Sequence, residues 1–227
     1  YFTFNNTMHP ENSNFHFRRP VQAACIAVFG LGVIYAVVTV LGLLSLPAPD
    51  EQIADPYFTL MEVLILLIAP LMALVILAVH FYAAADKKWY SLAAAIFIFI
   101  MAAITSCVHF TILTISRQPA AEQLAGHSFL FSFQWPSVVY ALDILAWDWF
   151  YALSVFFAAA VFKTGRLEKT IRTLLLVSGI LSLVGLLGIP FQNMQIRNIG
   201  IIGYAVLGPF AFLVIAKWFG LSGKTPD

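Results

Sequence analysis

Runs of apolar residues alternate with short polar segments along almost the whole chain. Each run reaches the ~20 residues that an α-helix needs to cross the hydrocarbon core of a bilayer. The predicted transmembrane spans cover residues 22–46, 57–83, 89–116, 136–162, 169–191 and 198–219. Lipid offers no partner for backbone N–H and C=O groups, and the alternation of a membrane β-strand is not visible, so these spans should be helical. The pattern predicts an all-α, polytopic membrane protein built as a six-transmembrane-helix bundle.

The spans follow one another so closely that residues 22–219 are expected to form one membrane domain. Residues 1–21 are an N-terminal segment, and residues 220–227 are a tail. Residues 1–7 precede Met8, which is the expected natural start, so they carry no weight in the fold prediction.

Prolines give more detail within the spans. Pro136 is expected at the start of the fourth span, where its missing N–H costs little. Pro70 and Pro209 lie inside spans and are expected to kink them.

Basic residues are distributed very unevenly between the two sides of the predicted bundle. Arg117 and Arg197 lie on the side of the longer loops, 47–56 and 117–135. The other ten lie on the side that holds both termini: Arg18, Arg19, Lys87, Lys88, Lys163, Arg166, Lys169, Arg172, Lys217 and Lys224. Cytoplasmic loops carry the excess of Lys and Arg. We therefore expect both termini in the cytoplasm, the longer loops outside, and a bacterial inner membrane as the location.

Composition supports the membrane assignment and excludes some functions. Only 10% of the residues are charged and 61% are hydrophobic, whereas a soluble domain has about 25% charged residues. A net charge of +1, with no basic run and no Gly-rich phosphate loop, argues against nucleic acid as a partner. The spacings typical of metal sites, such as CxxC and HExxH, are absent from the sequence, so neither a metal nor a cofactor is predicted.

Two carboxylates stand out in the fourth span, in the segment YALDILAWDWFY, Tyr140–Tyr151. An ionised carboxylate that faces lipid is costly, so Asp143 and Asp148 should point into the bundle. The two residues are five positions apart, which is about 140° around an α-helix. We therefore expect them to point in different directions, one toward the bundle centre and one toward a neighbouring helix.

Counting residues from the span ends places several polar side chains in one layer. Glu62, His109 and Asp143 fall about 8–12 Å below the outer boundary, with Thr39 and Tyr204 at a similar level and Asp148 about 18 Å deep. This shared depth predicts that Glu62, His109 and Asp143 converge in an outward-facing polar and aromatic cavity. The candidate ligand-binding residues are Glu62, His109, Tyr140, Asp143, Trp147, Asp148 and Tyr204.

Structural roles compete with the cavity hypothesis. His109 and the two aspartates would also suit hydrogen bonds between helices, and the aromatic residues would also suit simple packing. Glu62 could instead pair with Arg117 or Arg197. Residues 190–198 are expected to form a short outer turn whose polar side chains cap the cavity or the helix ends. Small residues on the last two spans, such as Ser178, Gly185 and Gly203, are expected to let those helices approach closely.

Three functions fit these residues, and the sequence leaves open whether the protein is an enzyme. The first is binding of a small molecule or lipid, as a receptor-like protein or a subunit of a larger membrane assembly or homo-oligomer. The second is an intramembrane hydrolase with Thr105 or Ser106 as nucleophile, His109 as base and Asp143 as orienting carboxylate. The third is a proton-coupled small-molecule transporter that uses Asp148 near the membrane midplane.

Overall fold

Helices make up most of the chain that the structure describes. The structure, a computed structural model, describes residues 10–48 and 51–221, with side chains from Phe17 onward. The uninterrupted spans are α1 (Pro10–Leu44), α2 (Tyr57–Tyr82), α3 (Lys88–Thr114) and α8 (Gly165–Leu186). Six helical stretches are long and apolar enough to cross a membrane, and the described ranges contain no strand. The all-α, six-span prediction is confirmed, and the chain is a multi-pass helical membrane protein.

The fourth and sixth spans are each interrupted by a π-helical stretch. The fourth consists of α6 (Val138–Ile144), the π-helical η2 (Leu145–Phe150) and α7 (Tyr151–Ala159). The sixth consists of α9 (Met194–Ile201), the π-helical η3 (Ile202–Leu207) and α10 (Gly208–Leu221). Three short helices lie in the connections: η1 (Ala85–Lys87), α4 (Pro119–Glu122) and α5 (His127–Phe131).

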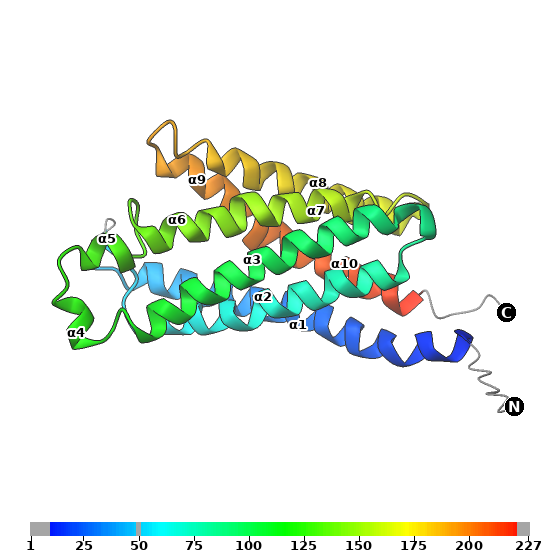
Figure 1. The fold of residues 1–227 in the computed structure, drawn as a ribbon, viewed down its shortest axis with the longest axis horizontal. Helices are drawn as coiled ribbons and strands as arrows, with labels where there is room; N and C mark the ends of the chain where they lie inside the picture. The colour runs from blue at the N-terminus through cyan, green and yellow to red at the C-terminus, as the bar shows by residue number, and fades with distance from the viewer. Residues whose placement is uncertain (1–9, 49–50, 222–227) are drawn as a thin grey trace, which may run out of the picture.

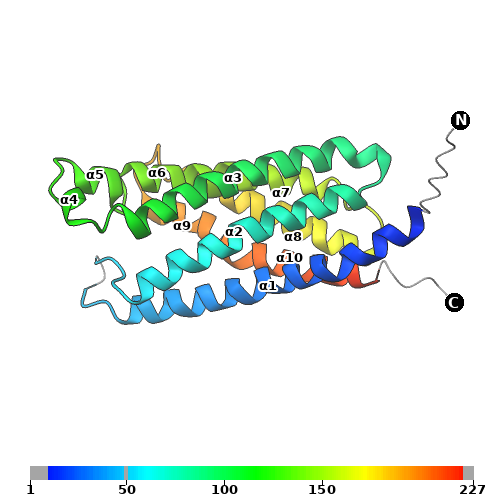
Figure 2. The ribbon, with the colours of Figure 1, turned by 60° about the horizontal axis from the view of Figure 1, so that its bottom comes forward.

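The six spans form a closed ring in chain order. α1 packs on α2, α2 on α3, α3 on α7, α7 on α8, and α8 on the sixth span, whose α10 returns to α1. Figures 1 and 2 show the spans running side by side along the long axis, with both termini at one end. Each polar side chain that points inward therefore faces helices from several parts of the chain.

Several predicted boundaries were wrong by a few residues. The first helix begins at Pro10 and carries Pro20 inside it, so it starts before residue 22, the predicted start of the first span. The fifth span begins at Gly165, because Glu168 accepts hydrogen bonds from the N–H groups of Lys163 and Thr164 at the helix start. The fourth begins at Val138, after the N-cap Ser137, so Pro136 precedes the helix.

The two prolines expected to kink spans lie inside them. Pro70 lies within α2. Pro209 is the second residue of α10 and directly follows the π-helical η3. Proline has no N–H to donate to the preceding turn, and the wider π-helical turns before Pro209 are where the regular α-helical bonding is interrupted.

Small residues bring the fifth and sixth spans together, as predicted. A Cβ on Gly203 would lie 2.6 Å from the Ser178 carbonyl oxygen, and one on Gly185 would lie 2.9 Å from Gly200 Cα. The Ser178 hydroxyl donates to the Gly203 carbonyl at 2.8 Å and also meets the Tyr151 hydroxyl at 2.7 Å. Close backbone approach of this kind is how helices associate in lipid.

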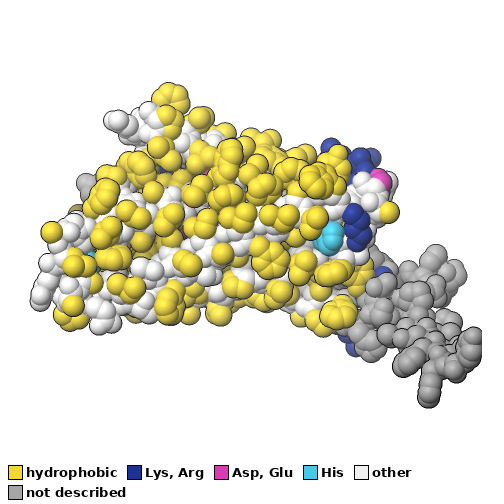
Figure 3. Space-filling view, in the orientation of Figure 1, with side chains coloured by type: hydrophobic (Ala, Val, Ile, Leu, Met, Phe, Trp, Pro, Cys, Tyr) yellow, Lys and Arg dark blue, Asp and Glu magenta, His cyan; other side chains and the backbone are white. Residues whose placement is uncertain are grey.

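The two ends of the bundle differ in character. At the long-loop end, defined by residues 47–56 and 117–135, Gln52 donates to Ser132 at 3.0 Å and Arg117 pairs with Asp55 at 3.2 Å. At the opposite end, which we call the termini end, Trp218 donates to Glu168 at 3.2 Å. Figure 3 shows an apolar surface along the length of the bundle, with Lys and Arg gathered near the termini. A membrane-spanning bundle requires polar ends and an apolar middle.

Asp55 organises the entry to α2 at the long-loop end. Its carboxylate accepts from the Thr59 hydroxyl at 2.5 Å and from the Thr59 N–H at 3.1 Å. The Thr59 hydroxyl is the main cause of an Asp55 pKa below its usual value, and the Arg117 guanidinium lowers the pKa further. An ionised Asp55 thus ties the first long loop to the second through Arg117.

The membrane orientation can be tested by cysteine labelling of intact cells. We expect a membrane-impermeant maleimide to modify Cys at position 122, but to modify Cys at position 166 only after lysis. Both positions are exposed. The native Cys25 and Cys107 would be replaced first. Neighbouring Gly126 and Gly165 are unsuitable because both have positive φ. Labelling at position 166 alone would reverse the predicted topology.

Candidate functional site

Five charged side chains from five helical segments meet inside the bundle. Each is at most 4% exposed. We call this set the ion-pair chain, and its members are Glu62 on α2, His109 on α3, Asp143 on α6, Asp148 on η2 and Arg197 on α9. Burying charges is expensive unless they are paired, so the fold must bring these side chains together.

His109 bridges two carboxylates. Its Nδ1 lies 2.7 Å from Glu62 Oε2, a hydrogen-bond distance. Its Nε2 lies 3.3 Å from Asp143 Oδ1, within ion-pair range but without hydrogen-bond alignment. Carboxylates only accept hydrogen bonds, so an imidazolium with both nitrogens protonated would serve both partners. Glu62, His109 and Asp143, which were predicted to converge, thus lie in direct contact range. Glu62 pairs with His109 and not with Arg117 or Arg197.

Arg197 extends the ion-pair chain beyond Asp143. Its Nη2 donates to Asp143 Oδ2 at 3.1 Å. Its Nε lies 3.6 Å from Asp148 Oδ2, which is too long for a hydrogen bond but within ion-pair range. One guanidinium therefore faces both aspartates of the fourth span.

Asp143 and Asp148 were expected to point in different directions, but both reach the same guanidinium, and Asp148 also lies against the neighbouring helix α8. The 140° separation assumed an α-helix, but most of the segment between them is the π-helical η2. A π-helix closes i→i+5 hydrogen bonds, so a residue and its fifth neighbour lie one turn apart on the same face. The extra width of η2 is what brings both carboxylates to Arg197.

Arg197 is the functional candidate that the sequence analysis placed in a turn rather than in the site. Residues 190–198 were expected to be an outer turn, but α9 already begins at Met194. The Asn193 side chain accepts from the Gln195 N–H at 3.0 Å and caps the helix. Arg197 thus lies one turn inside α9 and points into the bundle. An Asn followed by a helical pattern is an N-cap signal that would have indicated this start.

Aromatic side chains surround the guanidinium. The Arg197 Cζ lies 5.1 Å from the Tyr140 ring centroid and 5.8 Å from that of Tyr204, both within cation–π range. Trp147 packs on Tyr204 with the ring centroids 5.0 Å apart. Phe133 lies 5.7 Å from the His109 ring. The site is therefore ionic at its centre and aromatic at its edge.

A cavity of about 270 Å³ opens beside the ion-pair chain. Asp143 and Arg197 form its charged wall, with Tyr35, Tyr140 and Tyr204 around them. Trp147 of η2 and Phe133 also line it. Most of the other lining residues are apolar and come from α1, α2 and the sixth span: Val28, Met61, Ile65, Ile68, Met72, Ile201, Ala205 and Pro209. Glu62, His109 and Asp148 do not line the cavity and lie behind Asp143 and Arg197. The volume is close to the lower end of the roughly 300–1,000 Å³ typical of small-molecule sites.

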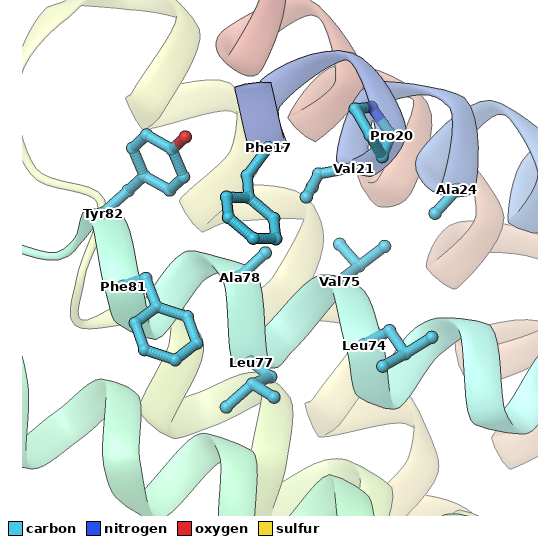
Figure 4. A pocket seen from close by; sticks show the side chains of 10 residues that line it. All are labelled: Phe17, Pro20, Val21, Ala24, Leu74, Val75, Leu77, Ala78, Phe81 and Tyr82. Atoms are coloured by element: carbon cyan, nitrogen blue, oxygen red, sulfur yellow. The ribbon is translucent and has the colours of Figure 1, made fainter. Parts of the chain in front are cut away.

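A second hollow lies between α1 and α2 near the termini end. It measures about 520 Å³, and its lining includes Phe17, Val21, Leu74 and Phe81 (Figure 4). The lining residues in this groove carry no charge. Phe17 and Phe81 are each 69% exposed, as expected for side chains that face lipid tails. The smaller cavity is the better functional candidate because it combines charged and apolar walls.

The groups of the predicted hydrolase are not arranged as a catalytic unit. The Thr105 hydroxyl donates to the Met101 sulfur at 3.6 Å, and both nitrogens of His109 face carboxylates. Ser106 is half-buried on the same helix, and its hydroxyl makes no hydrogen bond with His109. Among the described residues, no group of three or more His, Cys, Asp and Glu side chains is arranged to hold a metal ion.

Comparison of the chain with protein-family models, with curated proteins and with solved structures gives no match.

Proposed function

We propose that this protein binds a small amphiphilic molecule or lipid in the cavity beside Arg197, as a receptor-like protein or as a subunit of a larger membrane assembly. The observation that carries the proposal is the composition of the cavity wall. Asp143 and Arg197 supply one charged end, and aliphatic and aromatic side chains supply most of the remainder. Ligand sites typically combine a largely apolar lining with a few placed polar groups.

The side chains of the cavity wall limit which ligand groups can bind there. Arg197 supplies donors only and Asp143 accepts, so a ligand group that both accepts and donates, such as a hydroxyl or an amide, matches this end. The Arg197 charge is already matched by the Asp143 carboxylate at 3.1 Å, which makes a strongly anionic head group a poor fit. The ligand body would lie against Ile65, Ile68 and Ile201.

We place the long-loop end outside the cell and the protein in a bacterial inner membrane, on the strength of the Lys and Arg distribution. The cavity lining then begins within the outer third of the membrane, at Met61, and reaches Met72 further down α2. A ligand would enter from the outer leaflet or from the outer solution.

Binding is better supported than hydrolysis. A hydrolase needs a nucleophile within hydrogen-bond reach of its base, and His109 has carboxylates on both sides instead. The carboxylates and the imidazole hold one another in fixed positions, which suits a preorganised binding wall.

Filling the cavity tests the proposal. We expect Ile201→Trp to abolish retention of a co-purifying small molecule, measured by native mass spectrometry of the protein released from detergent. Ile201 lines the cavity, so the larger indole would occupy the ligand volume.

Ile202→Trp is the matched control. Ile202 is the next residue, is 51% exposed and faces outward, so the same substitution should leave the ligand bound. A ligand retained equally by both variants would lie elsewhere, and a wild type that carries no ligand in any preparation would contradict the proposed function.

A further inference from the structure

Asp148 is the member of the ion-pair chain with the poorest pairing. Neither of its carboxylate oxygens has a hydrogen-bond partner, although the side chain is fully buried. Its nearest cation is Arg197 Nε at 3.6 Å, while Nη2 of the same guanidinium is committed to Asp143. An ionised carboxylate left in this state inside a membrane protein would be strongly destabilising.

The total charge of the ion-pair chain is also unbalanced. Three carboxylates face one guanidinium and one imidazole, so one negative charge remains even when His109 is protonated. The charged groups that act on Asp148 are Arg197 and Asp143, with the tyrosines Tyr140 and Tyr204 beside them and His109 of α3 beyond Asp143. The last negative charge thus lacks a matching cation among the described residues.

The space around Asp148 restricts what can neutralise it. Oδ1 lies against the backbones of α8 and α9, so close that a Cβ on Gly185 would come within 2.9 Å of it and a Cβ on Gly200 would overlap it. Glycine at both positions leaves room for the carboxyl group itself but not for a coordinated metal ion with several oxygen ligands. Ser182, one turn before Gly185 on α8, is also fully buried with an unpartnered hydroxyl.

We propose that Asp148 is a proton-binding site and carries a proton at neutral pH. A proton needs no additional volume, removes the unmatched negative charge and turns Asp148 into a hydrogen-bond donor. The ion-pair chain then has two carboxylates and two cations, with Arg197 free to pair fully with Asp143.

The proton site is connected to the cavity through Arg197. Loss of the proton would leave two ionised aspartates competing for one guanidinium, and both Arg197 and Asp143 form the charged wall of the cavity. Ligand and proton would therefore alter each other's affinity by the same factor, because linkage is reciprocal. This coupling rests on the proposed ligand binding, whereas the proton on Asp148 does not. Such coupling is what the proton-coupled transporter predicted from the sequence would need.

Infrared spectroscopy tests the proton directly. We expect the wild-type protein in detergent at neutral pH to show a carboxylic-acid C=O band that shifts in D₂O. The band should disappear in Asp148→Asn and persist in Asp55→Asn, since Asp55 is exposed and paired with Arg117. Absence of the band, or its loss in Glu62→Gln or Asp143→Asn instead, would overturn the assignment.

Thermal stability across pH provides a second readout. If Asp148 holds its proton in the folded protein, Asp148→Asn should melt near the wild-type temperature below about pH 4, where the wild-type carboxyl is neutral in both states. As the pH rises above this value the variant should melt several degrees higher than the wild type, because only the wild type has a carboxyl that ionises on unfolding. A variant that fails to fold, or whose deficit widens as the pH rises, would show that the charged carboxylate is required and would refute the proton. Neither measurement involves the cavity ligand, so the two proposals can fail separately.

Discussion

Arg197→Ala should destabilise the protein by about 3–5 kcal/mol, the range seen when one partner of a buried ion pair is removed. The substitution leaves Asp143 with His109 as its remaining cationic partner and leaves Asp148 with none. The loss should grow as the pH rises, because the variant can escape the unpaired charge only by protonating a carboxylate. Thermal unfolding in detergent across a pH series measures both effects.

Matched variants separate the buried pair from ordinary surface pairing. Arg117→Ala removes a pair whose side chains are 34% and 57% exposed and should cost no more than about 1 kcal/mol. Combining Arg197→Met with Asp143→Asn and Asp148→Asn removes the unpaired charges and should recover much of the stability. An Arg197→Ala protein as stable as Arg117→Ala would show that the ion-pair chain contributes little to the fold.

Gly200→Ala should cost about 1–3 kcal/mol, as expected for overpacking a tight contact. The added methyl group would overlap Asp148 Oδ1, and the Asp148 side chain is fully buried beside Gly185 and Gly200. The same unfolding measurement applies. In addition, the variant should lose or shift the carboxylic-acid infrared band assigned to Asp148.

Gly30→Ala controls for the intrinsic effect of replacing glycine in a transmembrane helix. A Cβ on Gly30 meets no atom within 4 Å, so alanine there should be neutral or stabilising by up to about 1 kcal/mol. In an Asp148→Ala background, Gly200→Ala should become much milder, because its main obstacle has gone. An equal cost in both backgrounds would assign the effect to the Gly185 backbone instead.

The spans and the depth of the polar layer could be predicted because they depend on local properties. Apolar length and the absence of backbone partners in lipid determine where helices form. Counting along those helices at 1.5 Å per residue was enough to bring Glu62, His109 and Asp143 to one level.

The parts of the site that escaped prediction depend on contacts between distant segments. The π-helical stretch η2 brings Asp148 onto the Asp143 face, and nothing in LAWDWF by itself distinguishes a π-helix from an α-helix. Arg197 was missed as a site residue for a simpler reason: the last span was expected to begin at residue 198, four residues too late. A charged residue near a predicted span end therefore belongs in the search for intramembrane partners.

The π-helical stretches η2 and η3 also have a mechanical meaning. Each has wider turns than the α-helices on either side, and an exchange of i→i+5 for i→i+4 bonds would move the wide turn along the helix. Each exchange would rotate the intervening segment while both helix ends stay anchored at the membrane surfaces. In the fourth span, such a step would swing Asp148 away from Arg197 without tilting or translating the helix. A shift of this kind in η2 would therefore change the pairing of Asp148 while the other five spans keep their positions.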